Sequence, residues 1–189
     1  LPLGEATAAG CTLVAMIEIL EVLSPELCGR LARLTDDGGA PSPMLPERDG
    51  RVAVMDRRMK ARADHRLQDP ALVGAVAGAF ADGLLSHVRE HFGFAPMSFE
   101  SFKVVRYDAG EGWFRPHRDN VSVDARHRRV AVSLNLSEDF DGGELAFPEL
   151  DVSPWSGPTG TALVFECGLL HEVLPVTRGR RDALITFLW

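Results

Sequence analysis

The period of the hydrophobic positions changes near residue 99, from helical spacing before it to strand-like spacing after it. Ser24-Pro25-Glu26 combines an N-cap residue, a first-turn proline and an early acid, and a stripe at helical spacing follows: Leu27, Leu31 and Leu34. A longer stripe begins after Asp69-Pro70 and ends at Gly93; its members are Val73, Val76, Phe80, Leu84 and Val88. The first half therefore predicts two helices, with a short strand over Met16–Val22 before them and a loop rich in Gly and Pro over 36–50 between them.

The second half predicts a β core. Short runs of apolar residues are separated by turn signals such as Asp141-Gly142-Gly143 and Ser156-Gly157-Pro158. The predicted strands are Phe99–Tyr107, Arg129–Leu136, Glu144–Phe147, Thr161–Glu166, Leu170–Val176 and Asp182–Trp189. Many short strands indicate a sandwich or barrel rather than a parallel sheet, and the two helices are expected to pack on one of its faces.

Length and composition narrow the class of protein. The chain has 189 residues, which suit a single domain over 1–189, with helical support over roughly 16–93 and a β core over roughly 99–189. A net charge of −7 argues against a nucleic-acid partner, because phosphate contacts need a cationic face. The apolar stretches are too short for a membrane span, which argues against a membrane partner. The three cysteines form no C-x-x-C pair, so we expect a cytoplasmic protein, with Met16 as a candidate natural start.

The predicted strand Arg129–Leu136 has one apolar face and one face of small and polar residues. Alternation places Val130, Val132, Leu134 and Leu136 on the first face, and Ala131, Ser133 and Asn135 on the second. A polar inner face in a barrel indicates a wet pocket. Taken alone, however, this strand is better explained by a polar face in contact with solvent.

Two short motifs contain candidate metal ligands. His117-Arg118-Asp119 follows a Gly-rich approach, and in a strand His117 and Asp119 point the same way and can reach one ion. His171 lies 52 residues beyond Asp119, among leucines. Each signal alone fits a chance motif or a buried structural histidine. Together they form a candidate set of two histidines and one carboxylate, which leaves positions open on Fe(II) for oxygen chemistry.

The last predicted strand begins with two arginines. Alternation places Arg181 on the face of Ala183 and Ile185, and Arg180 on the opposite face. A guanidinium on an inner strand face needs a partner, and a carboxylate held by two hydrogen bonds suits arginine better than lysine. An arginine at a strand end that reaches back to solvent is an equally good explanation of this residue alone.

The combination of these residues, in order and spacing, resembles the Fe(II)/2-oxoglutarate-dependent dioxygenases, specifically their prolyl-4-hydroxylase-like branch. The resemblance covers about Phe99 to Trp189, with a fainter match in the helical half. The motifs that carry it are Tyr107 placed ten residues before His117-Arg118-Asp119-Asn120, then Ser133-Leu134-Asn135-Leu136, Gly142-Gly143-Glu144-Leu145, Phe147, Gly160-Thr161-Ala162-Leu163-Val164-Phe165, His171-Glu172-Val173, Pro175-Val176 and Gly179-x-Arg181.

The resemblance implies a double-stranded β-helix, the jelly-roll or cupin-like fold, and an enzyme that uses Fe(II), 2-oxoglutarate and O2. It implies that His117, Asp119 and His171 hold the iron. The near end of 2-oxoglutarate would chelate the iron and its far carboxylate would pair with Arg181. Tyr107 and Ser133 match positions near the cosubstrate, although Ser133 departs from the tyrosine that some animal members have there.

The implied activity is hydroxylation of an unactivated C–H bond in an amino acid or another small molecule, with succinate and CO2 as coproducts. The alternatives are a prolyl or other peptidyl hydroxylase that acts on a protein and, more remotely, a non-catalytic cupin-like binding module. A halogenase on this fold would lack the carboxylate that Asp119 supplies. A nucleic-acid dealkylase would carry a second arginine where Phe187 stands.

The substrate is left open by the sequence. The segment 36–66 would lie near the pocket mouth in this family and could act as a lid. It carries a cluster of basic residues that could receive an anionic group: Arg57, Arg58, Lys60, Arg62 and Arg66. A charged surface in contact with water is the favoured interpretation of that cluster.

Overall fold

The computed structural model describes residues 16–43, 56–96 and 98–189. The residues before the candidate start Met16 and the end of the predicted loop over 36–50 lie outside these ranges. The helices are α1 (Pro25–Ala32), the short turn η2 (Arg33–Thr35), α2 (Pro70–Ala79), the π-helical η3 (Phe80–Leu84) and α3 (Leu85–Phe92). The strands are β1 (Ile17–Glu21), β2 (Ala40–Pro41), β3 (Lys60–Ala61), β4 (Ala63–Arg66), β5 (Lys103–Asp108), β6 (Trp113–His117), β7 (Val130–Asn135), β8 (Phe140–Gly142), β9 (Leu145–Ala146), β10 (Thr161–Glu166), β11 (His171–Val173) and β12 (Val176–Leu188).

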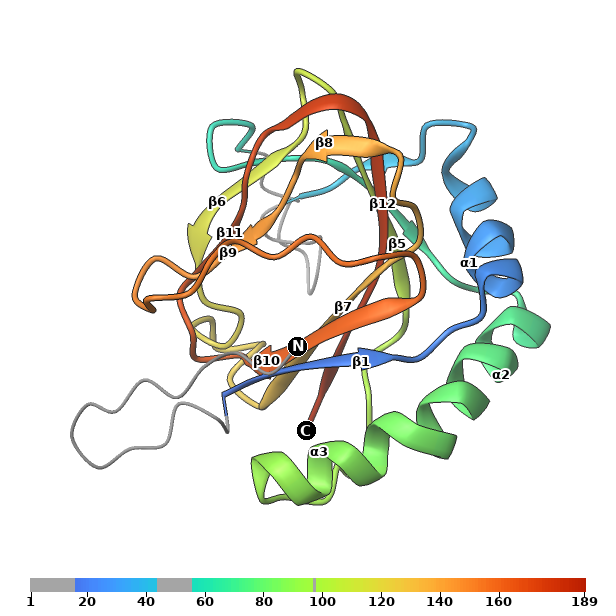
Figure 1. Cartoon of the computed structure of the whole chain (residues 1–189), viewed down its shortest axis with the longest axis vertical. Helices are drawn as coiled ribbons and strands as arrows, with labels where there is room; N and C mark the ends of the chain where they lie inside the picture. Colours follow the sequence, from blue (N-terminus) through green and yellow to red (C-terminus); the bar gives the residue numbers. More distant parts are fainter. Residues whose placement is uncertain (1–15, 44–55, 97) are drawn as a thin grey trace.

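The strands form two antiparallel sheets, which we call the large sheet and the small sheet (Figure 1). The large sheet runs in the order β1-β10-β7-β12-β5-β4-β2, with β8 also paired to β12. The small sheet runs in the order β3-β6-β11-β9. Side chains from both sheets meet in one buried cluster, which includes Ala131 and Ala183 of the large sheet and Phe114 and Val173 of the small one. The two sheets therefore enclose an interior between them.

The other face of the large sheet carries the helices. Val132, Leu134 and Leu184 point to this side and pack in a second buried cluster. The helical layer contributes Leu31, Leu72, Val76, Phe80, Leu84 and Val88 to the same cluster. Figure 1 shows the helices along the outside of the sheet and away from the interior. The expectation of helices on one face of a β core is confirmed.

The second helix runs from Pro70 to Phe92 and is interrupted by one π-helical stretch. Asp69 caps its start by accepting a hydrogen bond from the Ala71 amide at 2.8 Å, and Gly93 ends it with a left-handed backbone at φ 68°. By length and composition this is the one segment among the described residues that could cross a membrane, with a mean hydropathy of 1.5. Its buried stripe packs on the large sheet, and a helix that packs on a protein core passes the same test.

Several sheet predictions need correction. The first half of the chain is not only helical, because the short strands β2, β3 and β4 join the sheets and β2 lies inside the predicted loop. Trp113–His117 was not among the predicted strands, although His117 was argued as a strand residue, and it forms β6. Strand β12 begins at Val176 rather than Asp182, and the predicted run from Phe99 starts as a strand only at Lys103. These strands depend on pairing with distant segments, which the local pattern does not contain.

Candidate metal and cosubstrate site

The three candidate metal ligands come from the small sheet and the turn that follows it. His117 ends β6, His171 begins β11, and the two residues lie directly opposite each other in the ladder. Asp119 lies beyond the end of β6, in a turn whose amide donates to the Cys167 carbonyl at 3.0 Å. The argument that His117 and Asp119 share one strand face is therefore wrong, although the structure does bring them together. The Asp119 carboxylate is positioned by the turn after β6, which is hydrogen-bonded to Cys167 in the connection between β10 and β11.

The geometry of this triad suits a metal ion. One ligand atom from each of the three residues lies within 4.8 Å of the others. His117 Nε2 is 3.6 Å from Asp119 Oδ1, and His171 Nε2 is 3.3 Å from Asp119 Oδ2. Two nitrogens and one carboxylate on one side of a site are the donors that non-haem Fe(II) oxygenases use.

Backbone carbonyls fix the orientation of both imidazoles. His117 Nδ1 donates to the Arg115 carbonyl at 2.8 Å, and His171 Nδ1 donates to the Leu169 carbonyl at 3.1 Å. A carbonyl oxygen only accepts, so the proton in each neutral ring sits on Nδ1. The Nε2 lone pair of each ring is then free to bind a metal, which is the usual outer support of a metal-binding histidine.

The charges in the triad also favour metal binding. Burial raises the pKa of Asp119, but the neighbouring His117 and His171 side chains outweigh burial and hold this pKa below its ordinary value. Burial lowers the pKa of His171, the charge of Asp119 opposes that shift and the charge of His117 adds to it. These two directions favour an ionised Asp119 and a neutral His171, the forms that bind a divalent cation.

Aromatic rings hold the imidazole planes. Phe114 stacks on His117 with ring centroids 3.5 Å apart, and Phe165 meets His171 edge to face at 4.7 Å. Phe147 packs in turn against Phe165 at 5.2 Å. These rings pack against the two imidazoles and help to fix their planes.

The candidate cosubstrate anchor comes from the large sheet. Arg181 on β12 is 2% exposed and points to the interior between the sheets, as alternation predicts. Its Nη2 donates to Ser133 Oγ at 3.3 Å and to Asn135 Oδ1 at 3.0 Å, and its Nε donates to the same oxygen of Asn135 at 3.2 Å. Both partners are neutral, and no carboxylate forms an ion pair with Arg181 within the ranges that the structure covers. The guanidinium keeps its charge in a buried place that suits an incoming carboxylate.

These contacts correct the interpretation of strand β7. The face that carries Ser133 and Asn135 is not in contact with solvent, because the two residues are 8% and 0% exposed and both contact Arg181. Asn135 is a site residue that the sequence reasoning did not select. Its Nδ2 donates to the Gly157 carbonyl at 2.8 Å, which turns its Oδ1 toward Arg181. Alternation with Ser133 was the signal that could have found it.

The glycine pair before β9 makes room for Arg181. Gly142 and Gly143 both have left-handed backbones, with φ of 74° and 70°. A Cβ on Gly143 would lie 3.2 Å from Arg181 Cδ and 2.9 Å from Val176 Cγ2. The Gly142-Gly143 motif therefore leaves space for the buried arginine as well as forming a turn.

Tyr107 lies between two arginines. Its ring is 5.6 Å from Arg181 Cζ, and its hydroxyl accepts a hydrogen bond from Arg62 Nη1 at 3.0 Å. Arg62 also pairs with Asp64, with Nε 2.8 Å from Oδ1. The Tyr107 hydroxyl still has its own proton to donate, so it can serve a carboxylate held by Arg181.

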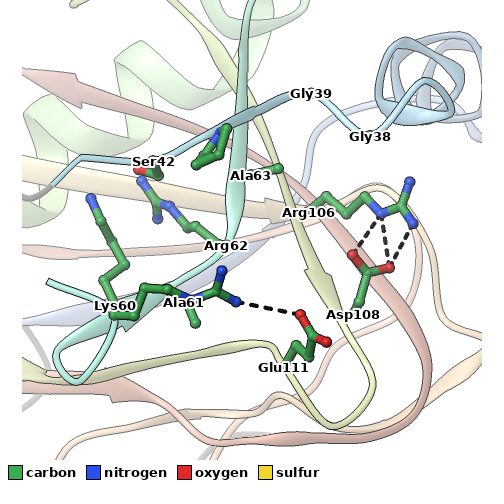
Figure 2. A pocket seen from close by; sticks show the side chains of 12 residues that line it. Gly38, Gly39, Ser42, Lys60, Ala61, Arg62, Ala63, Arg106, Asp108 and Glu111 are labelled. Atoms are coloured by element: carbon green, nitrogen blue, oxygen red, sulfur yellow. Dashed lines mark hydrogen bonds and ion pairs between the residues drawn. The ribbon is translucent and has the colours of Figure 1, made fainter. Parts of the chain in front are cut away.

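A cavity of about 170 Å³ is lined by part of the basic segment, including Lys60 and Arg62. Figure 2 shows both side chains rising from one strand segment toward Ser42, with Arg106 and Asp108 on the other side of the pocket. Lys60 is 8% exposed, and its Nζ donates to the Pro43 carbonyl at 2.6 Å. Burial lowers the pKa of Lys60 to about 7, with the charge of Arg62 acting in the same direction. The expectation of a water-exposed basic cluster holds for Arg57, Arg58 and Arg66 and is wrong for Lys60 and Arg62.

Sequence comparison places the chain among known proteins. Residues 102–189 match the family model of the 2OG-Fe(II) oxygenase superfamily. A PKHD-type hydroxylase from Caulobacter vibrioides is 30% identical over 184 residues, which cover 92% of this chain and 77% of that protein. A PKHD-type hydroxylase from Maricaulis maris is 33% identical over 120 residues, which cover 58% of this chain and 54% of that protein.

The chain belongs to the 2OG-Fe(II) oxygenase superfamily. It is an Fe(II)- and 2-oxoglutarate-dependent dioxygenase related to the PKHD-type hydroxylases, and its cofactors are Fe(II), 2-oxoglutarate and O2.

Solved structures agree on the fold of this oxygenase. A prolyl-4-hydroxylase from Pseudomonas putida is similar with a TM-score of 0.70 and 23% identity, over 92% of both chains. A prolyl hydroxylase from Trichoplax adhaerens, solved with a peptide fragment, is similar with a TM-score of 0.72 and 19% identity, over 93% of this chain and 84% of that one. The expectation of a double-stranded β-helix is confirmed.

The residues of this oxygenase fit the cofactors of the superfamily. The triad offers two Nε2 lone pairs and an ionised carboxylate on one side. The Arg181 guanidinium is buried beside neutral partners, as a site for a dicarboxylate needs. The metal donors come from the small sheet and the carboxylate anchor from the large sheet, so a cosubstrate that bridges the two would lie between the sheets.

Proposed function

We propose that this oxygenase hydroxylates an unactivated C–H bond of an amino acid or another small molecule that carries an anionic group. His117, Asp119 and His171 hold Fe(II), and Arg181 binds the far carboxylate of 2-oxoglutarate. One observation carries this assignment: a metal-binding triad and a buried arginine without a carboxylate partner, among the described residues, face one interior from opposite sheets. The overall reaction converts substrate C–H, O2 and 2-oxoglutarate to C–OH, succinate and CO2.

Iron with 2-oxoglutarate supplies the oxidising chemistry when both are bound. The chain supplies position and environment. Ser133 and Asn135 hold the Arg181 guanidinium in place, so little side-chain freedom is lost when a carboxylate binds. Tyr107 can donate its hydroxyl proton to that carboxylate. The rings of Phe114 and Phe165 pack on His117 and His171 and would help to hold their Nε2 atoms in place for the iron.

The preference for a small anionic substrate rests on Lys60. This lysine lines the 170 Å³ cavity, and within the described ranges its ammonium has only a carbonyl oxygen as a hydrogen-bond partner. Lys60 also packs over the ring of Phe114, with its Nζ 5.1 Å from the ring centroid, and Phe114 stacks on His117. A substrate carboxylate bound to Lys60 would lie on the side of Phe114 and His117, and the proposal is that the rest of the molecule reaches the iron from there.

Hydroxylation is favoured over halogenation because Asp119 fills the third ligand position. Peptidyl hydroxylation is the second candidate, and it draws on the peptide bound to the Trichoplax adhaerens prolyl hydroxylase. A peptide presents few free carboxylates to a buried lysine, so the two candidates predict different responses when Lys60 is replaced.

The test measures succinate release from the iron-loaded protein with two panels, free amino acids and proline-containing peptides, with products analysed for a gain of one oxygen. We expect free acids to stimulate succinate release and to gain the oxygen. Lys60→Met should raise the KM for such a substrate about tenfold or more, whereas Arg58→Met, which changes an arginine with a 92% exposed side chain, should leave the KM unchanged. Stimulation by peptides alone, with no effect of Lys60→Met, would assign the peptidyl reaction instead.

A further inference from the structure

A second cluster of metal-binding side chains lies outside the oxygenase site. It consists of Glu18 on β1 and of His87 and His91 on α3. One ligand atom from each residue lies within 4.8 Å of the others. The cluster faces the helical layer, because Glu18 alternates along β1 with Ile17, which packs in the interior cluster, and shares its side with Leu20, which packs in the helical one. It therefore lies on the opposite side of the large sheet from the triad.

The helix provides the spacing. His87 and His91 are four residues apart, which places them one above the other on one face of α3. Their rings are parallel and stacked, with centroids 3.7 Å apart and planes 16° apart. Two imidazoles in this arrangement on a helix can turn their nitrogens toward one ion, as paired histidines do in helical zinc sites.

A hydrogen bond to the backbone leaves His91 with a free lone pair on Nε2. Its Nδ1 lies 3.0 Å from the carbonyl oxygen of His87, and a carbonyl can only accept. The Nδ1 therefore carries the proton, and the Nε2 of the neutral ring is left with an exposed lone pair. His117 and His171 are oriented in the same way, by hydrogen bonds from Nδ1 to the backbone carbonyls of Arg115 and Leu169.

Glu18 supplies the negative charge. Its Oε2 lies 3.2 Å from His87 Nε2, close to the separation that two ligands of one tetrahedral zinc ion would have. A zinc ion would take the place of the proton now shared between these two atoms. The C-terminal end of α3, which follows at Phe92, adds the partial negative charge of its free carbonyls.

We propose that Glu18, His87 and His91 form a second, zinc-binding site, with water as the fourth ligand. Two imidazoles and one carboxylate are donors that zinc accepts in a four-coordinate site. The ion would join β1 of the large sheet to α3 of the helical layer, and so would link two elements that are 69 residues apart in the chain. This site does not depend on the proposed function, because it shares no residue with the oxygenase site.

The test counts zinc ions bound to the full chain by equilibrium dialysis followed by elemental analysis. Zinc also binds the donors of the oxygenase triad, so wild-type protein should bind two ions per chain. His91→Ala should bind one ion, because it removes one ligand of the second site. The variant should still fold, because His91 is exposed and alanine is a strong helix former. His171→Ala should also bind one ion, and the double variant none. His65→Ala is the matched control, since it removes a histidine outside both clusters and should bind two ions.

A second measurement locates the ion at the contact between sheet and helix. In a His171→Ala background, zinc in about hundredfold excess over its Kd should raise the Tm by roughly 5–10 °C. Glu18→Gln and His91→Ala in that background should lose most of this rise. The proposal is overturned if His91→Ala binds two ions as the wild type does, or if the rise in Tm persists in both variants. A simple ion pair between Glu18 and His87 instead predicts one zinc ion in the wild type and no rise in Tm in the His171→Ala background, and either result would also overturn the proposal.

Discussion

The two faces of the large sheet use the same strands for different purposes. On β7, Val132 and Leu134 point outward into the cluster shared with the helices, while Ser133 and Asn135 point inward to Arg181. On β12, Leu184 points outward and Arg181 points inward. All six side chains are buried, so burial alone does not separate a structural residue from a functional one. The outward side chains are apolar and pack against other apolar side chains. The inward ones are polar, and the Arg181 guanidinium can still bind a carboxylate.

This comparison teaches where polarity is tolerated in a packed sheet. A buried polar residue costs stability unless hydrogen bonds compensate it. On the inner face, hydrogen bonds offset only part of the cost of burying Arg181. In the described part of the chain, no carboxylate forms an ion pair with its guanidinium. Substitutions of Val132, Leu134 or Leu184 on the outer face should therefore lower stability, whereas substitutions of Ser133, Asn135 or Arg181 on the inner face should weaken ligand binding.

The largest effect is expected where the inner site binds metal. His171→Ala should reduce Fe(II) affinity by more than about hundredfold, since loss of an outer partner of a metal ligand alone costs ten- to hundredfold. The fold should remain, because the outer face is untouched. Iron titration and circular dichroism measure the two properties. Unchanged iron affinity in His171→Ala would refute the ligand assignment, and His65→Ala serves as the histidine control.

The next effect concerns the outer face. Leu134→Ala should lower the free energy of unfolding by about 2–5 kcal/mol, because it leaves a cavity between sheet and helices. The 2-oxoglutarate affinity of the fraction that remains folded should change little. Chemical denaturation and ligand titration below the transition give both values. A loss of affinity as large as the loss found in site variants would show that the faces are coupled.

The two adjacent arginines of β12 give an intermediate effect. Arg181→Ala should weaken 2-oxoglutarate binding by roughly ten- to a hundredfold, the equivalent of about 1.5–3 kcal/mol for a charge-assisted hydrogen bond. Arg180→Ala should change it little, because Arg180 pairs with Asp182 at 2.7 Å and Asp36 at 3.0 Å on the outer side. Titration of each iron-loaded variant tests this pair. Equal losses would contradict the inward assignment of Arg181.

The smallest effect is a dependence of stability on pH that comes from Lys60. Burial lowers its pKa to about 7 in the folded protein, so between pH 7 and 10 the unfolded chain binds more protons than the folded one. Stability relative to Lys60→Met should therefore rise with pH in that window, by less than about 1.4 kcal/mol per pH unit. Denaturation of both proteins at pH 6, 7, 8, 9 and 10 measures the difference. Parallel curves would mean that the lysine titrates normally.

Much of the site followed from residue order. Alternation within β12 separates Arg181 from Arg180, and alternation within β7 places Ser133 on one face with Asn135. These relations are local, because side chains in a strand alternate whatever lies around them. The helix boundaries at Asp69 and Gly93 followed from the chemistry of their caps for the same reason.

What the sequence by itself determined is therefore which residues of β7 and β12 share a face, and, through family resemblance, which residues belong to one site. The tertiary structure decided which faces are buried. The polar face of β7 is enclosed because the small sheet lies across from it, and Lys60 and Arg62 turn inward because their segment pairs with β6 of one sheet and then, through β4, with β5 of the other. Those pairings join residues 37 to 54 positions apart, and such contacts depend on the whole packed chain rather than on any local pattern.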